Sequence, residues 1–425
     1  MMHDRWGVGV VALVFMTACG GDDAGVETPP PDDSSVMEAA QALLEHEGFP
    51  GMAFATVTRE GVSWTASLGD ADPENDLPVT SDTAFWLASV TKPVTGLALL
   101  AAREDGALDL DTPIAELLQA KENFTLASPH AEDITIEHLV THRSSILDAD
   151  AYECAYFLGD ELGEHTSLAN ELYGEPLCDD TAPADLGGFL ESYLEADGVY
   201  FSTENFAPER PGERVEYSNV GAALAGFAIE LATGASLADF ASERFFEPLG
   251  LANTSFHLSD LDASTVAVPY TTHPETGERL RLPLYSLSTW PDGGLRSSAN
   301  DLGKLVATVM NHGAFGDVRL LEESSVETAL EPRASLAEGV NLGVFWVSGV
   351  THTLTTDGQP HDIVFHDGGD TGAFSYVVFD RDTRVGLLIL ANGDYAAGEA
   401  SSDELLATLV QRLFALATEY ADQRD

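Results

Sequence analysis

Two stretches at opposite ends of the chain have the pattern of antiparallel β-hairpins. Residues 51–71 (GMAFATVTREGVSWTASLGDA) contain two runs of alternating apolar residues around the turn Arg59-Glu60-Gly61. Residues 374–394 (FSYVVFDRDTRVGLLILANGD) repeat this pattern around a turn at 380–383. A period of two predicts strands, and a short polar turn between two strands predicts that they pair. Strands at both ends of a chain point to one sheet that both termini build.

Between the hairpins, the sequence has mostly helical periodicity, as at 92–103, 220–233 and 299–311. A further amphipathic helix is expected at 401–421, with Ser402 as its N-cap. We therefore predict an α/β protein of the α+β type. Its antiparallel sheet is flanked by helices, and a mostly helical subdomain is inserted at about 86–310.

The N-terminal residues 1–18 predict an export signal. Their apolar run is too short to span a membrane as a helix, and small residues precede Cys19. This arrangement resembles a bacterial lipoprotein signal, in which Cys19 would be lipidated and would anchor the chain to a membrane. An ordinary cleaved signal that discards Cys19 is the alternative. The chain is thus expected outside the cytoplasm, facing the periplasm or the cell exterior.

Residues 19–35 are rich in Gly, Pro, Asp and Ser, which predicts a disordered acidic tether. The folded domain is expected at 36–420. The chain has 71 acidic against 19 basic residues, a net charge of −52. Nucleic acids and anionic lipid surfaces would repel such a chain, so neither is an expected partner. Nothing in the residues assigns an oligomeric state.

Two cysteines remain after Cys19, and in an oxidising compartment Cys154 and Cys178 are expected to form a disulfide. Two unrelated buried thiols are the alternative. A pair of cysteines is a poor case for a metal site, and no metal or organic cofactor is expected. The surrounding segment 146–210 fits no simple period, and we interpret it as a long ordered loop region.

Ser89 and Lys92 have the spacing of a nucleophile and its base. Residues three apart on a helix share one face, one turn apart. Lys92 is one of only three lysines, and it lies in the apolar stretch FWLASVTKPVTGLALL at 85–100. Burial lowers the pKa of a lysine, so a neutral Lys92 could take the proton of Ser89. Taken alone, the Ser-x-x-Lys spacing is a weak signal.

Two further motifs carry candidate site residues. Tyr217 and Asn219 stand just before a helix rich in small residues; a phenol can relay protons and an amide can bind a substrate carbonyl. A tyrosine packed on the core and an asparagine that caps the helix are the alternative. In the other motif, 366–369 (HDGG), glycines before a strand allow a backbone amide to complete an oxyanion hole. A glycine-rich turn without a site is the alternative there.

The three motifs in this order resemble the serine β-lactamase-like family: class C β-lactamases, penicillin-binding D,D-peptidases, D-aminopeptidases and esterases. The resemblance extends over roughly residues 40–418. It implies a β-lactamase/transpeptidase-like fold and an acyl-enzyme mechanism. By this resemblance, Ser89 is the nucleophile, Lys92 is its base and Tyr217 is a proton relay. Asn219 binds the substrate amide, and the backbone amides of Ser89 and Gly369 form the oxyanion hole. His366 and Gly368 stand in the family's Lys-Thr-Gly motif, which binds substrate.

Two departures from the family pattern bear on loop shape and on substrate. The family's His-Thr-Ser-Gly-Leu appears as His-Arg-Ser-Ser-Ile at 142–146, which loses the glycine. Asp367 replaces a threonine that helps to bind the carboxylate of a β-lactam, and His366 is expected to be only partly charged. We therefore rank a neutral ester or amide, or a substrate with a free amine, above a β-lactam.

The expected function is that of an exported serine hydrolase acting on a small-molecule or peptide substrate, as an esterase or a peptidase. A β-lactamase is the alternative enzyme. A non-catalytic envelope protein that binds a ligand with the same fold is the alternative from another class. An intact Ser89, Lys92 and Tyr217 argues against that class, because a buried lysine is costly to keep.

Overall fold

The computed structural model describes residues 33–119, 124–158, 166–173, 177–180, 185–272, 276–355 and 358–423. The predicted signal at 1–18, Cys19 and most of the predicted tether lie outside these residues and stay predictions. Among the described helices, none is by itself long and apolar enough to cross a membrane; one bent pair, Asn219–Thr233 with Leu237–Leu249, passes that length and composition test together.

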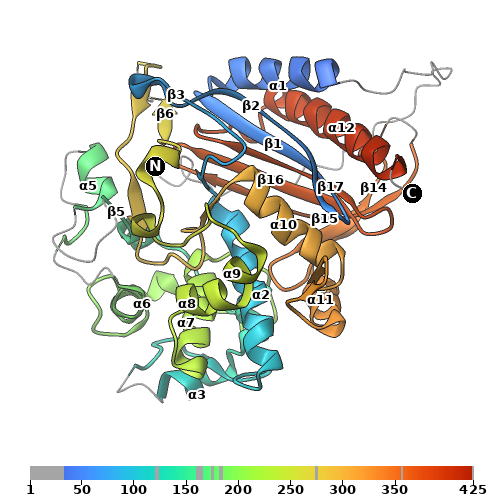
Figure 1. The fold of residues 1–425 in the computed structure, drawn as a ribbon. Helices are drawn as coiled ribbons and strands as arrows, with labels where there is room; N and C mark the ends of the chain where they lie inside the picture. Colours follow the sequence, from blue (N-terminus) through green and yellow to red (C-terminus); the bar gives the residue numbers. More distant parts are fainter. Residues whose placement is uncertain are drawn as a thin grey trace.

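A nine-stranded antiparallel sheet dominates the described structure, and the two predicted hairpins lie side by side in it (Figure 1). In the first strand, Met52 pairs with Ala391 of the last one. The fold predicted from both termini is therefore confirmed. In sheet order the strands are β12 (Ala334–Ala337), β13 (Val340–Leu342), β14 (Val347–Thr351), β15 (His361–Asp370), β16 (Ala373–Asp380), β17 (Val385–Ala391), β1 (Gly51–Thr58), β2 (Gly61–Asp72) and β3 (Leu77–Pro78).

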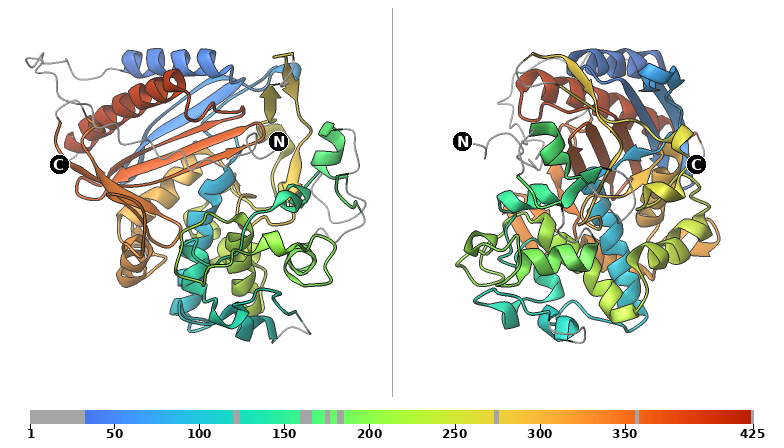
Figure 2. Two further views of the ribbon diagram at one scale, coloured as in Figure 1. Left: turned by 180° about the vertical axis from the view of Figure 1, so that it is seen from behind. Right: turned by 90° about the vertical axis from the view of Figure 1, so that its left-hand side faces the viewer.

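Helices cover both faces of this sheet. α1 (Asp33–Glu47) and α12 (Ala400–Asp422) pack together on one face, where Met52 and Phe54 of β1 point (Figures 1 and 2). Ala53 and Ala55 point to the other face, against α10 (Ala299–Met310). Because both faces are covered, β1 is buried throughout. α10 thus packs on the sheet, although the predicted subdomain at 86–310 includes its residues.

Two predictions about the terminal helices are wrong in detail. The last three residues of the predicted tether, 33–35, belong to α1, whose first turn carries Asp33, a favourable charge at a helix N-terminus. The N-cap of α12 is Glu399 without a capping side chain, and Ser402 is buried inside the helix. The chain thus enters this helix three residues before the predicted cap.

The second part of the molecule is built around α7 (Asn219–Thr233), which packs against α2 (Thr91–Glu104) and four shorter helices. Its small and apolar residues are buried over most of its length, as expected of a central helix. The remaining helices are α3 (Ile114–Gln119), α4 (Ile136–Val140), α5 (Leu168–Tyr173), α6 (Leu186–Leu194), α8 (Leu237–Ala241), α9 (Glu247–Leu249) and α11 (Glu323–Leu330).

Short strand pairs connect these helices to the sheet. They are β4 (Phe85–Trp86) with β9 (Arg296–Ser297), β5 (Tyr156–Leu158) with β8 (Tyr285–Leu287), β6 (Tyr270–Thr272) with β7 (Arg279–Arg281), and β10 (Ala314–Phe315) with β11 (Val318–Arg319).

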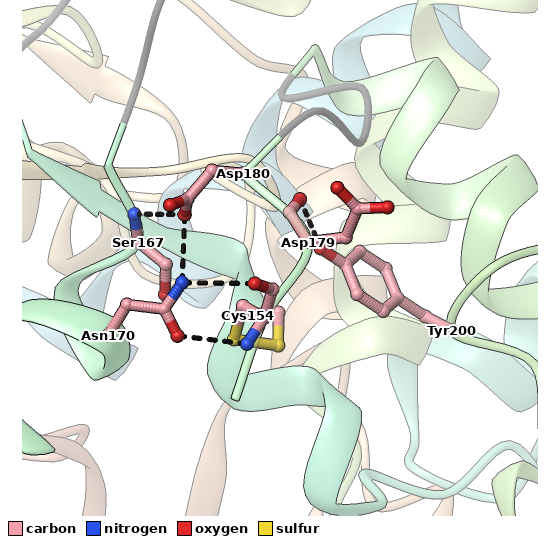
Figure 3. The surroundings of a disulfide bond; sticks show 7 residues. Cys154, Ser167, Asn170, Asp179, Asp180 and Tyr200 are labelled. Carbon is pink, nitrogen blue, oxygen red and sulfur yellow. Dashed lines mark hydrogen bonds between the residues drawn. A yellow bond between two sulfur atoms is a disulfide. The ribbon is translucent and has the colours of Figure 1, made fainter. Parts of the chain in front are cut away.

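The segment 146–210 is more regular than the predicted loop. It contains α5, α6, β5 and the 3₁₀ turn η4 (Asp150–Ala155). Cys154 in η4 forms a disulfide with Cys178 (Figure 3). The side chain of Asn170 makes two hydrogen bonds to the backbone of Cys178, at 2.9 and 3.0 Å. The disulfide therefore joins η4 to the 177–180 segment.

Candidate active site

Ser89 lies in the 3₁₀ turn η2 (Ala88–Val90), directly before α2. Its neighbour Ala88 has a φ of 45°, a left-handed conformation that costs roughly 1–2 kcal/mol in a residue with a side chain. The turn packs tightly on β15: a Cβ at Gly368 would lie 2.4 Å from the Leu87 carbonyl oxygen and 2.9 Å from the Ser89 amide nitrogen. A glycine is needed at this point of β15, and the strained turn sets where Ser89 stands.

Lys92 is fully buried, and its ammonium group has three acceptors. Nζ donates to Ser89 Oγ at 3.1 Å, to Asn219 Oδ1 at 2.7 Å and to the Asp292 carbonyl oxygen at 2.8 Å. Burial lowers the pKa of Lys92 to about 8, although the negative charges of Asp292 and Asp148 oppose this shift. A neutral, basic form of Lys92 is therefore accessible close to physiological pH.

Tyr217 approaches the same serine from the other part of the molecule. Its hydroxyl donates to Ser89 Oγ at 2.8 Å, and its ring centroid lies 4.9 Å from Lys92 Nζ. Burial raises the pKa of Tyr217 well above its usual value, so the phenol keeps its proton at neutral pH. His142 stacks on this ring with centroids 4.3 Å apart and accepts a hydrogen bond from the Ser218 amide at 3.2 Å.

The N-terminus of α7 brings Tyr217 and Asn219 to Ser89. Ser218 is the N-cap, and its hydroxyl accepts from the Gly221 amide at 2.9 Å. The half-buried carboxyl group of Asp148 accepts from the amides of Asn219 and Val220 at 2.7 and 3.0 Å. Asn219 is thus the first residue of the helix and not its cap, which leaves its side chain for Lys92.

The prediction that the 366–369 motif precedes a strand is wrong, because the motif lies inside β15. Glycine and aspartate have low strand propensity, so the local sequence hides a strand that pairing with β16 enforces. Burial and the charge of Lys92 lower the pKa of His366 to about 3. The imidazole is therefore neutral at neutral pH, where we expected a partial charge.

Strand alternation separates the four residues of this motif. Asp367 pairs with Tyr376, which belongs to the core under α1 and α12, so its side chain lies on the sheet face away from Ser89. Gly368 packs on the Ser89 turn, and Gly369 is exposed, with no atom within 4 Å of a Cβ built there. The expected direct repulsion of a substrate by Asp367 is therefore not supported by the position of this side chain.

The loop that lacks the family's glycine keeps a left-handed residue at that point. Ser145 has a φ of 64°, and its hydroxyl donates to the Glu209 carbonyl oxygen at 2.8 Å. His142 at the start of the same loop and Phe345, whose rings are 5.5 Å apart, also have positive φ values of 53° and 58°. Strained residues thus cluster around Tyr217, as they often do around functional sites.

Four residues at the site were missed in the sequence: Asp148, His142, Tyr152 and Asp292. Asp292 belongs to the stretch PDGGL, whose acidic residue before two glycines was its only local signal. The described residues contain no group of three or more His, Cys, Asp or Glu that could hold a metal ion. The arrangement around Ser89 offers a nucleophile, a lysine that can lose its proton and a phenol that can donate one, all within hydrogen-bond distance.

Comparisons with known proteins find similarity over most of the chain. The family model described as Beta-lactamase matches residues 36–412. Penicillin-binding protein 4* of Bacillus subtilis is 24% identical over 364 residues, which cover 83% of this chain and 70% of that protein. Esterase EstB of Burkholderia gladioli is 26% identical over 388 residues, 85% of this chain and 90% of that protein. The octameric penicillin-binding protein homologue from Pyrococcus abyssi superposes with a TM-score of 0.69 at 23% identity, over 88% of this chain and 76% of that one.

Proposed function

Because the chain belongs to the beta-lactamase family, whose model matches residues 36–412, we propose that it is a serine hydrolase that forms an acyl-enzyme on Ser89 and cleaves an ester or an amide/peptide bond. The observation that carries this proposal is the convergence of Lys92 Nζ and Tyr217 Oη on Ser89 Oγ, at 3.1 and 2.8 Å. Tyr217 and Ser89 are 128 positions apart in the sequence. Lys92 can accept the proton of Ser89 and Tyr217 can donate one, as a nucleophilic serine requires.

In the proposed acylation, neutral Lys92 takes the proton of Ser89 as Oγ attacks the carbonyl carbon. The negative charge that develops on the carbonyl oxygen is stabilised by the amides of Ser89 and Gly369. Tyr217 donates its proton to the leaving oxygen or nitrogen and regains one from Lys92, which returns Lys92 to its neutral form. Water then attacks the acyl carbon, the same groups move its proton to Ser89 Oγ, and the acid is released.

The charges near Ser89 favour an acyl donor without a negative group. Asp370 acts electrostatically on Lys92, and although burial raises its pKa to about 6, its carboxyl group is mostly ionised at pH 8. His366 is neutral and supplies no cation for a substrate carboxylate. A neutral or amine-bearing donor suits these surroundings better than a β-lactam, whose carboxylate needs a cationic partner.

A matched pair of esters tests this preference. We expect a kcat/KM for p-nitrophenyl butyrate about fivefold or more above that for mono-p-nitrophenyl succinate at pH 8, because about 1 kcal/mol of repulsion corresponds to that ratio. The ratio of the two kcat/KM values should decrease at high salt, where the charges are screened. Faster hydrolysis of the succinate ester, or turnover of a chromogenic cephalosporin at the rate of a dedicated β-lactamase, would reverse the ranking.

The acyl-enzyme itself is the direct test of the proposed function. The purified chain, mixed rapidly with p-nitrophenyl butyrate and quenched in acid, should gain the mass of one butyryl group on the peptide that contains Ser89. Release of p-nitrophenol should accompany the adduct. A chain that binds ester or peptide ligands but never carries an acyl group would instead support the ligand-binding alternative.

A further inference from the structure

The turn between β8 and β9 holds a buried acid beside Lys92. Three polar side chains of α2 form hydrogen bonds with the backbone of this turn. Lys92 Nζ donates to the Asp292 carbonyl oxygen at 2.8 Å, and Thr95 Oγ1 donates to the Pro291 carbonyl oxygen at 2.7 Å. The Thr91 hydroxyl accepts from the Leu295 amide at 3.1 Å. The position of Asp292 relative to Lys92 is therefore set by the helix that carries Lys92.

The carboxyl group of Asp292 is held from the opposite side by Tyr152. Asp292 is 2% exposed, and the Tyr152 hydroxyl lies 3.2 and 3.3 Å from its two oxygens. Among the described residues, no Lys, Arg or His nitrogen lies within ion-pair distance of this carboxyl group. Tyr152 belongs to η4, the turn that the disulfide at Cys154 ties to the 177–180 segment.

Other ionisable groups also face this pair. Asp148, Asp370 and Asp367 act on Lys92 with smaller effects than Asp292 does. The remaining groups are the imidazoles of His142 and His366, which are neutral, and the phenols of Tyr217, Tyr152 and Tyr156, whose pKa values burial raises. Burial pushes both members of the pair toward neutrality, since it lowers the pKa of Lys92 and raises that of Asp292. Each charge in turn stabilises the other, so the two groups titrate together.

We propose that Asp292, held by Tyr152, is a positioning residue that sets how tightly Lys92 holds its proton, and thereby the pH above which acyl transfer to Ser89 begins. The inference rests on the proposed role of Lys92 as the base. An ionised Asp292 stabilises the Lys92 ammonium and delays its loss of a proton as pH rises. A neutral residue at 292 leaves only desolvation and the more distant carboxylates, so Lys92 becomes a free base at lower pH.

The test compares the pH dependence of kcat/KM for p-nitrophenyl butyrate in the full chain and four variants. The acid limb of each profile is the range below neutral or mildly basic pH in which kcat/KM rises with pH. We expect the acid limb of Asp292→Asn to lie about one pH unit below that of the wild type. Tyr152→Phe should move the limb in the same direction by less, because it removes a hydrogen bond that favours the ionised carboxyl. Asp292→Glu, which restores the charge, should move it back. Thr95→Val, which loosens the same turn without a change of charge, should leave the limb in place.

A second readout does not depend on catalysis. The chain has three lysines, Lys92, Lys121 and Lys304, so a titration followed by NMR of ¹³Cε-labelled lysine resolves Lys92 directly. Its pKa should fall in Asp292→Asn relative to the wild type. An unchanged Lys92 titration and acid limb in Asp292→Asn, or an equal shift in Thr95→Val, would overturn the inference. Hydrolysis that does not depend on Ser89 would instead contradict the proposed function, and the NMR titration would still decide the role of Asp292.

Discussion

Ser89→Ala is expected to lower kcat/KM for p-nitrophenyl butyrate by roughly 10³-fold or more, because it removes the only atom on which the proposed acyl-enzyme can form. The serine side chain is small and its hydroxyl is shared by Lys92 and Tyr217. Without this hydroxyl, Lys92 still donates to Asn219 Oδ1 and to the Asp292 carbonyl oxygen. We therefore expect the fold to persist. Steady-state p-nitrophenol release and a thermal unfolding curve on the same preparation measure both effects.

Ser401→Ala is the matched control for this loss. Ser401 is exposed on α12, on the sheet face away from Ser89, and its substitution should leave kcat/KM and the unfolding midpoint unchanged. Equal rates in Ser89→Ala and the wild type would contradict the nucleophile assigned here. An adduct on another residue in the acylation experiment would contradict it as well.

Lys92 predicts a steep pH dependence. The neutral amine is the proposed base, and the pKa of Lys92 is lowered to about 8, so kcat/KM should rise about tenfold per pH unit below pH 8 and level off above it. The sign follows from protonation: below pH 8 most molecules carry the ammonium, which cannot accept the Ser89 proton. On the plateau above pH 8, Lys92→Met should lose about 10²–10⁴-fold in kcat/KM, and its rate should no longer rise between low pH and pH 8.

Lys304→Met controls for the loss of a lysine as such. Lys304 donates to the carbonyl oxygens of Leu249 and Gly250, away from Ser89, and its replacement should leave the pH profile unchanged. Full activity of Lys92→Met at neutral pH would refute the assignment of the base. A profile that falls with rising pH would show that a protonated group is required instead.

The two terminal hairpins could be predicted because their pattern is local. Alternating apolar residues and a short turn specify a strand pair without reference to the rest of the chain, and β1, β2, β16 and β17 form as expected. β15 could not be found this way, since its residues 366–370 include two glycines and two aspartates. Pairing with β16 supplies its strand conformation, which is a tertiary effect.

The candidate site divides in the same way. Ser89 and Lys92 are three residues apart, and helical geometry alone places them together. Tyr217 and Asn219 were connected to them only by resemblance to a family, because no local rule relates residues about 127 positions apart. Asp292 and Tyr152, 140 positions apart, gave no usable signal, and the field that they create at Lys92 exists only in the folded chain.

The sequence by itself determined the sheet that both termini build, the helix that carries Lys92 one turn after Ser89, and the acidic character of the chain. These features depend on periodicity, spacing and composition, which short segments contain in full. Only the tertiary structure decided that His366 is neutral, that Asp367 points away from Ser89 and that Asp292 stands beside Lys92. Burial and electrostatic fields depend on which distant segments come together, and those contacts are properties of the packed molecule rather than of any stretch of its sequence.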